Sequence, residues 1–329
     1  MKSLTRSLPT SLLSIESVLE ARVRLRNRVV HTPLQASAAI GHNLGATTYL
    51  KLECLQRTGS FKARGAFNKL LSLSDSQRKR GVVGVSGGNH AQGLAYAAKD
   101  LGVRATICMP ASTPSNYLEA TRGYGADVVL CPDITAAFAE GRRLRDSGMV
   151  EVHPFDDILV AAGQGTVGLE IIDDLPEMTR IYVSIGGGGL ISGVATALRR
   201  RRPDIRVFGV ETDGANAMAR SLAAGGLIDM PAITSIARTL GAPRVSDFTL
   251  RHVQELVEEV MVVDDSEAFD ALKFILERAK ILTEPAAACC LAAARRHAGT
   301  FAPNEKVVIL LCGGNASMHD LSQWQARFA

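Results

Sequence analysis

The 329-residue sequence has no long apolar run and few aromatic residues. No stretch reaches the roughly 18 consecutive apolar residues that a transmembrane helix needs, so a membrane is not expected as a partner. Phe, Trp and Tyr make up 5% of the chain, and the net charge is only +4. Nucleic-acid binding calls for a basic face with interleaved aromatic side chains. The densest basic run, Arg199–Arg202, instead fits a solvated helix end, so no nucleic acid is expected either.

Paired cysteine motifs are also absent. Most of the six cysteines lie inside apolar runs, and none belongs to a C-x-x-C pair. There cysteine behaves as a small hydrophobic residue, so neither a disulfide framework nor a zinc site is predicted. The N-terminus carries Lys2 and Arg6, but serine and proline interrupt its apolar stretch. This is a poor signal peptide, and we expect a cytoplasmic protein.

Short runs rich in β-branched residues alternate with helical patterns along the chain. The expected strands are Thr48–Glu53, Val82–Ser86, Arg104–Met109, Asp127–Cys131, Ile181–Ile185, Arg206–Glu211, Glu259–Val263 and Lys306–Leu311. Most of these runs are apolar throughout, as is typical of strands covered on both faces. Helical periodicity fills several gaps, for example Ala91–Leu101, Leu190–Arg200 and Ser266–Ala279. The alternation predicts an α/β fold with mostly parallel sheets.

Glycine clusters follow three of the expected strands, at Gly87-Gly88, Gly186–Gly189 and Gly313-Gly314. Ligands of open α/β sheets bind beyond the carboxyl ends of the strands. Three glycine-rich loops in that position predict one site built from distant segments. The four glycines Gly186–Gly189 exceed what a tight turn needs, and their backbone N–H groups before a helix favour phosphate binding.

A dinucleotide is the alternative ligand for these loops. After the glycine run, Glu211 fits the acidic residue of a dinucleotide fold, but the third glycine of G-x-G-x-x-G is missing. Gly163–Gly168 matches the glycine pattern in full, yet no clear strand precedes it. A nicotinamide cofactor therefore stays an alternative to another phosphate-bearing ligand.

Side chains near the glycine loops have both a structural and a chemical interpretation. Lys62 opens a helical pattern after Phe61 and is either a surface lysine or a nucleophilic amine beside an apolar wall. The segment Val85–Gly93 either caps a helix or holds a carboxylate. Cys312 ends a buried strand, and Glu284 precedes Pro285 at a helix start.

Together these segments resemble the threonine/serine dehydratase and serine racemase family of fold-type II pyridoxal-phosphate enzymes. The motifs follow in family order: His31–Leu34, Thr58–Ala66, Ser86–Gly93, His153 with Ala161–Thr166, Ile185–Gly193, Thr283–Ala288 and Leu311–Asn315. The resemblance covers nearly the whole chain. It implies two open, mostly parallel twisted sheets with flanking helices, like tryptophan synthase β. It also implies a large cofactor-binding domain of residues 1–78 and 154–329, with an inserted small domain of residues 79–153.

The resemblance also implies roles for individual residues, with pyridoxal 5'-phosphate as cofactor. Lys62 is the Schiff-base lysine that takes the substrate's α-proton. The residues expected to contact the cofactor are Phe61, Lys62, Asn89, Gly186, Gly187, Gly188, Gly189 and Cys312. The residues expected to contact the substrate are Ser86, Gly87, His90, Glu284 and Arg238. A neutral Cys312 at the pyridine nitrogen would suit elimination rather than transamination.

The sequence departs from the family pattern at three places. Gly87 stands where racemases carry a serine that transfers a proton, which favours elimination. The family's cation site corresponds to Glu211, Ala215 and Ala217, and since Ala217 replaces an acid we expect no metal. Arg238 lies in a segment that often reads Ala-Asp-Gly, so it meets either an acidic substrate group or an internal partner.

The expected activity is a β-elimination that converts an L-β-hydroxy amino acid, threonine or serine first, into a 2-keto acid and ammonia. The alternatives are a dehydratase for phenylserine or 3-hydroxyaspartate and a serine racemase. From other classes, a nicotinamide oxidoreductase and a non-catalytic pyridoxal-phosphate-binding protein stay open. The expected partners are a small amino-acid substrate and further copies of the chain, as a dimer or tetramer.

Overall fold

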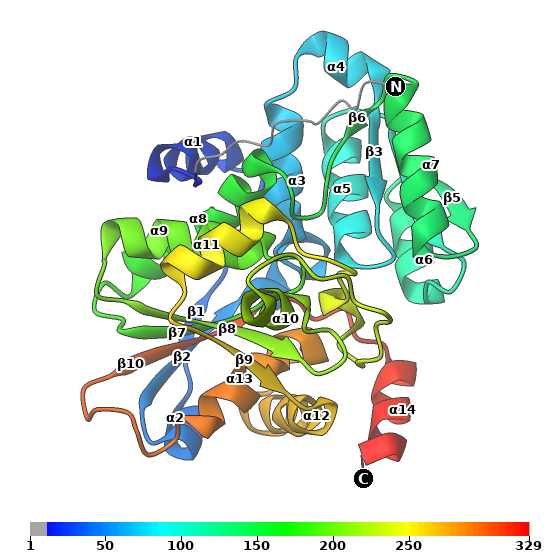
Figure 1. Cartoon of the computed structure of the whole chain (residues 1–329). Coiled ribbons are helices and arrows are strands. Elements are labelled where there is room, and N and C mark those ends of the chain that lie inside the picture. The colour runs from blue at the N-terminus through cyan, green and yellow to red at the C-terminus, as the bar shows by residue number, and fades with distance from the viewer. Residues whose placement is uncertain (1–11, 329) are drawn as a thin grey trace.

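A computed structural model describes residues 12–328 and contains two β-sheets with helices around them (Figure 1). Lys2 and Arg6, on which the expectation of a cytoplasmic protein partly rests, lie outside the described residues. The larger sheet has the strand order β1-β2-β10-β7-β8-β9 and the smaller one the order β5-β4-β3-β6. Every neighbouring pair is parallel except β1 with β2.

The larger sheet draws its strands from both ends of the chain. Its strands are β1 Leu34–Ala36, β2 Thr47–Leu52, β7 Arg180–Ser184, β8 Arg206–Thr212, β9 Glu259–Val263 and β10 Lys306–Leu311. The smaller sheet is built from β3 Val82–Val85, β4 Ala105–Pro110, β5 Asp127–Cys131 and β6 Val150–Glu151. The predicted fold class, α/β with two mostly parallel sheets, is confirmed. The division into a domain of residues 1–78 and 154–329 and one of residues 79–153 stays a prediction.

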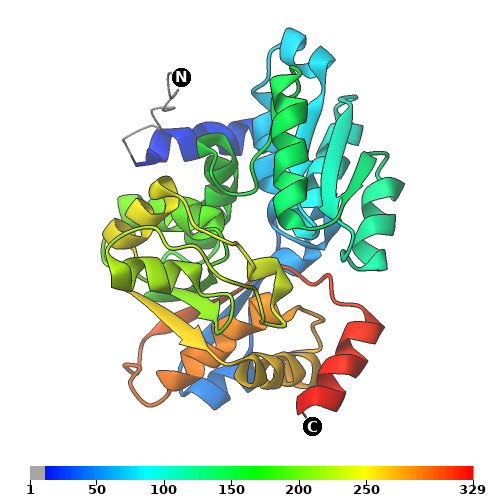
Figure 2. The same cartoon turned by 45° about the vertical axis from the view of Figure 1, so that its right-hand side comes forward.

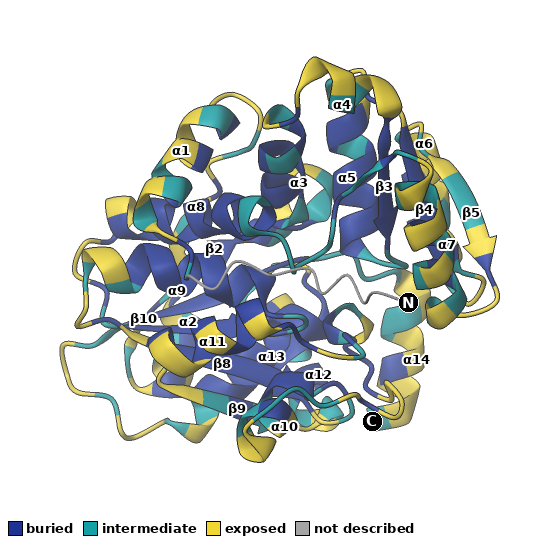
Figure 3. Cartoon of the chain, turned by 45° about the horizontal axis from the view of Figure 1, so that its top comes forward, coloured by how far each residue is buried: buried dark blue, intermediate teal, exposed yellow. Residues whose placement is uncertain are grey.

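Helices cover both faces of each sheet. They are α1 Ile15–Leu25, α2 Ala38–Leu44, α3 Lys62–Leu71, α4 Asp75–Arg80, α5 Asn89–Asp100, α6 Ser115–Gly123, α7 Ile134–Asp146, α8 Ile158–Asp174, α9 Gly189–Arg201, α10 Ala217–Ala224, α11 Asp247–Leu256, α12 Asp265–Phe274, α13 Pro285–Arg296 and α14 Met318–Phe328. In Figure 1, α8, α9 and α11 lie on one side of the larger sheet, and α2, α12 and α13 on the other. The strands between them are mostly buried, except the edge strands β1 and β9, which are partly exposed, and the outer helix faces are exposed (Figure 3).

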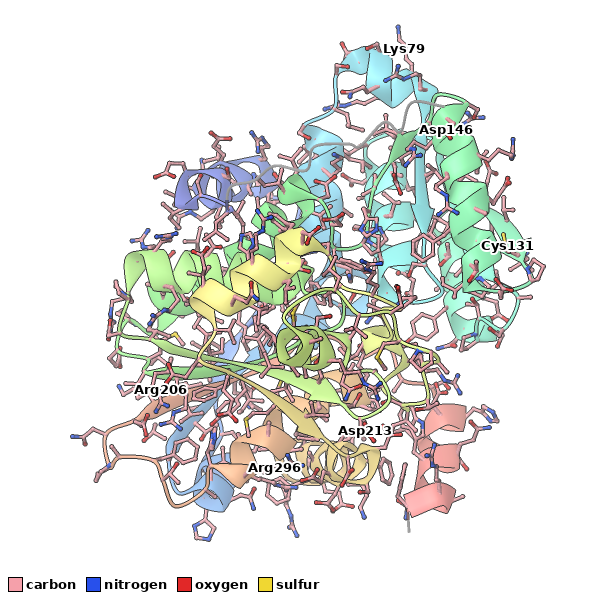
Figure 4. The ribbon with its side chains drawn as sticks, viewed as in Figure 1. Lys79, Cys131, Asp146, Arg206, Asp213 and Arg296 are labelled. Carbon is pink, nitrogen blue, oxygen red and sulfur yellow. The ribbon has the colours of Figure 1, made fainter. Side chains whose placement is uncertain are left out.

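The unit around the smaller sheet lies beside the larger one, with the C-terminal helix α14 below it (Figure 2). Helices α5 and α7 pack on its strands. Figure 4 labels Lys79 at the tip of this unit and Cys131 at its outer edge, whereas Arg206 and Arg296 belong to the larger unit. No helix within residues 12–328 is long and apolar enough to cross a membrane.

The predicted helix Ser266–Ala279 changes character before its end. Helix α12 ends at Phe274, and a π-helical turn, Ile275–Ala279, follows. The turn is continuous with α12 because Ile275 keeps helical dihedral angles. The sequence pattern found the helical segment but not its wider last turn.

The glycine pattern Gly163–Gly168 lies inside helix α8 and serves helix packing. A Cβ atom at Gly165 would lie 2.9 Å from the carbonyl oxygen of Gly193 in α9. At Gly163 it would lie 2.7 Å from the carbonyl oxygen of Arg64 in α3. These glycines let α8 approach both neighbours, so the match to a dinucleotide motif has a structural explanation.

Candidate active site

A cavity of about 620 Å³ opens between the two sheets, where several strands end. Ser86 follows β3, Ser184 ends β7 and Cys312 follows β10, and all three line the cavity. The site residues expected from the sequence come together there: Phe61, Lys62, Ser86, Gly87, Asn89, His90, Gly186, Gly187, Gly188, Gly189, Arg238, Glu284 and Cys312. Glu211, Ala215 and Ala217 do not line it. The strand-end argument thus locates one site built from segments far apart in sequence.

Lys62 begins helix α3, and its side chain reaches into this cavity. Its Nζ donates a hydrogen bond to the carbonyl oxygen of Pro154 at 2.9 Å. Burial lowers the pKa of the amine from its ordinary value of 10.5 to about 8. About a tenth of Lys62 is therefore the free, nucleophilic base at pH 7, and about half at pH 8.

A buried ion network holds α3 in place. Two residues after Lys62, Arg64 is fully buried and donates to Glu53 at 2.8 Å and to Glu170 at 2.6 Å. Lys51 of β2 donates to the same Glu170 at 2.7 Å. Two cations thus offset two anions, and removing one member of such a buried set is strongly destabilising. No local sequence pattern predicts this network, although charged residues inside otherwise buried segments are its visible signal.

Glu284 is the centre of a second buried network. Its carboxylate accepts hydrogen bonds from the Asn89 amide and the Thr239 hydroxyl, both at 2.9 Å, and from the Asn315 backbone N–H at 3.2 Å. Burial raises the pKa of this carboxyl group, while the three donors oppose the rise. Asn315 also donates to Asn89 Oδ1 at 2.7 Å, which fixes the orientation of that amide. Thr239 and Asn315 are site residues to which the sequence analysis gave no role.

Cys312 places a neutral thiol in the cavity wall. Ser184 Oγ donates to Cys312 Sγ at 3.2 Å, and the thiol faces the carbonyl oxygen of Ala286 at 3.8 Å. Burial, and next the negative charge of Glu284, raise the pKa of Cys312 well above its ordinary value. The thiol therefore keeps its proton throughout the physiological pH range.

His90 is held as a neutral imidazole. Its Nε2 lies 2.9 Å from the carbonyl oxygen of Val152, so this nitrogen carries the proton and Nδ1 is an acceptor. Burial, together with the charge of Lys62, lowers the pKa of His90 to about 3. The buried Nδ1 has no partner within the described part of the chain. In this state His90 offers no hydrogen to a carboxylate.

The glycine run Gly186–Gly189 passes through a crowded turn. Gly188 adopts a φ of +92°, which disfavours any side chain, and a Cβ at Gly187 would lie 2.1 Å from the Phe155 ring. The run leads into α9, whose first N–H groups have no partner within the helix. Bare backbone, a helix N-terminus and a cavity on one side fit a phosphate group.

The residues that correspond to the family's cation site, Glu211, Ala215 and Ala217, do not fit a metal. The Glu211 carboxylate accepts the backbone N–H groups of Met218 at 2.9 Å and Ala219 at 2.8 Å. It thereby caps helix α10, while Ala217 offers no side-chain oxygen. Burial raises the pKa of Glu211 to about 8. Residues 12–328 contain no group of three or more His, Cys, Asp or Glu arranged to hold a metal.

Comparison with known proteins decides the family. Residues 25–313 match the family model described as pyridoxal-phosphate dependent enzyme. The chain belongs to this family. An L-threonine ammonia-lyase of Thermotoga maritima is 41% identical over 310 residues, which cover 94% of this chain and 77% of that protein. A catabolic L-threonine dehydratase of Escherichia coli is 36% identical, over 94% of this chain and 95% of that protein.

Solved structures of the family have the same fold. Maize serine racemase superimposes with a TM-score of 0.91 at 37% identity, covering 97% of this chain and 98% of the racemase. The processed form of threonine deaminase isoform 2 from Solanum lycopersicum reaches a TM-score of 0.89 at 31% identity, over 96% of this chain and 95% of that one. The fold-type II resemblance seen in the sequence is thereby confirmed. Both elimination and racemisation occur among the names of these relatives, so the names alone do not assign the reaction.

The glycine run gives a first test of the family's cofactor in this chain. Gly187→Val is expected to raise the dissociation constant for pyridoxal phosphate about 5- to 150-fold, because overpacking a tight site costs ~1–3 kcal/mol. The new Cβ would overlap the Phe155 ring and displace the loop. Gly226→Val is the matched control, since a Cβ there meets no atom within 4 Å. Equal affinity in a folded Gly187→Val protein would contradict a role in phosphate binding.

Proposed function

We propose that the protein is a pyridoxal-phosphate-dependent ammonia-lyase that removes water from an L-β-hydroxy amino acid, threonine and serine in the first place. The Cα–H and Cβ–O bonds break, a Cα=Cβ bond forms, and hydrolysis of the resulting enamine gives a 2-keto acid and ammonia. The observation that carries the proposal is Lys62, an amine whose pKa burial lowers to about 8, in one cavity with the bare backbone of Gly186–Gly189 and a neutral thiol. The names of the relatives support the same reaction.

The chain's own residues would hold the cofactor from several sides. Lys62 would bind it covalently, with Phe61 against its ring and Gly186–Gly189 around its phosphate. Asn89 is oriented by Asn315 and Glu284 and would donate to or accept from the ring hydroxyl. Cys312, kept as a thiol, would face the ring nitrogen without charging it. When bound, the cofactor supplies the electron sink for the bonds broken at Cα.

Lys62 is the proposed proton acceptor of the reaction. Its free amine would be placed to remove the α-proton of a substrate bound in the cavity. An amine with a pKa near 8 is basic enough to accept this proton and is largely unprotonated at mildly alkaline pH. By lowering the pKa of Lys62, burial thus suits this side chain both to bind the cofactor and to accept a proton.

The loop of residues 86–89 is the proposed binding site of the substrate carboxylate. Ser86 Oγ accepts the backbone N–H of Gly88 at 3.1 Å, which leaves the hydroxyl hydrogen free to be donated to a ligand. Gly87 keeps this stretch of backbone open. Since His90 donates to Val152, we assign it to positioning the loop. Glu284 keeps the neighbouring Asn89 in place.

Three further expectations belong to the proposal. The small domain of residues 79–153 would carry the carboxylate loop, and the large domain of residues 1–78 and 154–329 the glycine run. The protein would work in the cytoplasm and as a homodimer or homotetramer. Gel filtration with light scattering tests the assembly.

The pH dependence of cofactor uptake follows from Lys62. Attachment needs the unprotonated amine, so the rate at which the apoprotein takes up pyridoxal phosphate should rise about tenfold per pH unit and level off near pH 8. The sign follows from the lowered pKa, because a surface lysine would go on gaining free base to beyond about pH 10. Mixing apoprotein and cofactor from about pH 6 to pH 9 measures this curve. A rate still rising tenfold per unit at the upper end would contradict a buried Lys62 amine.

The activity itself is tested with a panel of amino acids. The holoenzyme is incubated with L-threonine, L-serine, phenylserine and 3-hydroxyaspartate, and keto acid and ammonia are measured together. We expect equal amounts of both products from threonine or serine. The absence of ammonia and keto acid with every member of the panel would overturn the proposed function.

A further inference from the structure

Arg238 stands out among the charged residues that line the cavity. Its side chain is exposed and makes no hydrogen bond or ion pair with any residue between 12 and 328. The other lining charges are engaged: Glu284 holds its network, Asp320 accepts from the Ser317 hydroxyl at 2.6 Å, and Arg327 lies 3.8 Å from Asp265. An exposed arginine that lines the cavity and has no partner among these residues has the five donor hydrogens of its guanidinium available for a ligand.

The backbone around Arg238 is held firmly, although its side chain is unpaired. Arg238–Leu240 forms a 3₁₀ turn, closed by the Gly241 N–H on the Arg238 carbonyl oxygen at 3.0 Å. On one side Ser235 donates to Asp265 at 2.6 Å, and on the other Thr239 donates to Glu284 at 2.9 Å. An anchored backbone reduces the entropy lost when a ligand orders the side chain.

The turn that carries Arg238 touches both predicted binding loops. A Cβ at Gly186 would lie 3.1 Å from the Leu240 backbone, so the turn packs against the glycine run. A Cβ at Gly88 would lie 3.4 Å from Thr239, so the turn also packs against the carboxylate loop of residues 86–89. Burial raises the pKa of the Tyr117 hydroxyl, and the positive charge of Arg238 opposes this rise. Tyr117 belongs to helix α6 and lines the same cavity. Arg238 is therefore within two residues of both contacts, one with the loop that would hold the cofactor phosphate and one with the loop that would hold the substrate carboxylate.

We infer that Arg238 binds a second carboxylate, carried on the β-carbon of the substrate. Besides threonine and serine, the site would then take a β-hydroxy amino dicarboxylic acid, for which 3-hydroxyaspartate is the smallest probe. This inference rests on the proposed function, since it names the substrate of the same site. Arginine suits the task because its planar fork matches a carboxylate with two parallel hydrogen bonds. The methyl group of threonine would leave those donors unused.

The test compares selectivity between two substrates. The quantity is the ratio of kcat/KM for L-threo-3-hydroxyaspartate to that for L-threonine. We expect this ratio to fall by about 10- to 100-fold in Arg238→Met relative to the unmodified holoenzyme, the effect typical of losing a charge-assisted hydrogen bond. In Arg238→Lys the ratio of kcat/KM values should fall less, because lysine retains the positive charge but lacks the planar guanidinium. A ratio that stays the same in Arg238→Met would overturn the inference.

Arg244→Met is the matched control. Arg244 follows on the same loop and is exposed, but it pairs with Asp229 at 3.3 Å and does not line the cavity. Its replacement removes one positive charge nearby and should leave the ratio unchanged. An equal fall in both variants would show a general charge effect and count against Arg238.

A binding measurement separates this inference from the proposed reaction. L-Aspartate and L-alanine carry no β-hydroxyl group, so calorimetric titration of the holoenzyme reports affinity without elimination. Arg238→Met should lower the affinity for L-aspartate about 10- to 100-fold more than the affinity for L-alanine. If no substrate yields keto acid but this relative loss is seen, the carboxylate site stands and the proposed lyase activity fails. Equal affinity changes for the two ligands would refute the site whatever the catalytic result.

Discussion

Replacing Lys62 by alanine is expected to slow keto-acid release by at least about 10³-fold, because one substitution removes both the cofactor's attachment point and the base for the α-proton. Positioned acid–base groups alone contribute ~10²–10⁴-fold to a rate. Within residues 12–328 no other lysine lines the cavity, so no neighbouring amine takes over. Steady-state assays with L-threonine measure the loss.

The matched control for this variant is Lys79→Ala. Lys79 lies at the tip of the smaller unit, away from the cavity (Figure 4). Its replacement should leave activity within about twofold, as is usual for surface changes. Thermal unfolding of both variants shows whether the fold survives. A folded Lys62→Ala protein with more than about a tenth of the original activity would be incompatible with the proposed mechanism.

The second large effect concerns the choice between elimination and racemisation. Racemisation needs a proton donor on the face of the substrate opposite Lys62, and Gly87 has no side chain to supply one. With L-serine we expect pyruvate to form at least about 10²-fold faster than D-serine, since a missing acid–base group costs that much. Chiral chromatography of one incubation measures both products. D-serine produced as fast as pyruvate would contradict the argument from Gly87.

In the structure, the space for a side chain at position 87 is occupied by Thr113. A Cβ at Gly87 would lie 2.7 Å from Thr113 Oγ1, and this hydroxyl is buried without a hydrogen-bond partner in the described chain. A serine at position 87 would have to displace Thr113. We therefore expect Gly87→Ser alone to raise D-serine formation little, and Gly87→Ser with Thr113→Ala to raise it about 10- to 100-fold. Equal D-serine yields from the single and double variants would count against this coupling.

The strands were predictable because they are apolar on both faces. Val82–Val85 and Lys306–Leu311 are almost completely buried, and their continuous apolar runs give their position within a residue. Two short strands were missed. Leu34–Ala36 lies at the sheet edge with partly exposed side chains, and Val150–Glu151 has only two residues. Neither is long enough to produce an alternating or continuous pattern.

The site was predictable where backbone geometry dictates residue type, and less so where partners are distant. Gly186–Gly189 and Lys62 have local signals, namely a strand end before a helix and a helix start. The hydrogen bond between Asn315 and Asn89 joins residues 226 positions apart, and no local sequence pattern predicts it. The contact between Thr113 and Gly87 is likewise visible only once the ends of β3 and β4 lie side by side.

The most direct measurement of the central claim locates the cofactor on the chain. The holoprotein is reduced with borohydride, digested and analysed by mass spectrometry for a pyridoxyl-phosphate-modified lysine. The account predicts one modified peptide that contains Lys62, and loss of the absorbance of the bound cofactor. Modification of a different lysine, or no modified peptide from a protein that is active on L-threonine, would contradict it.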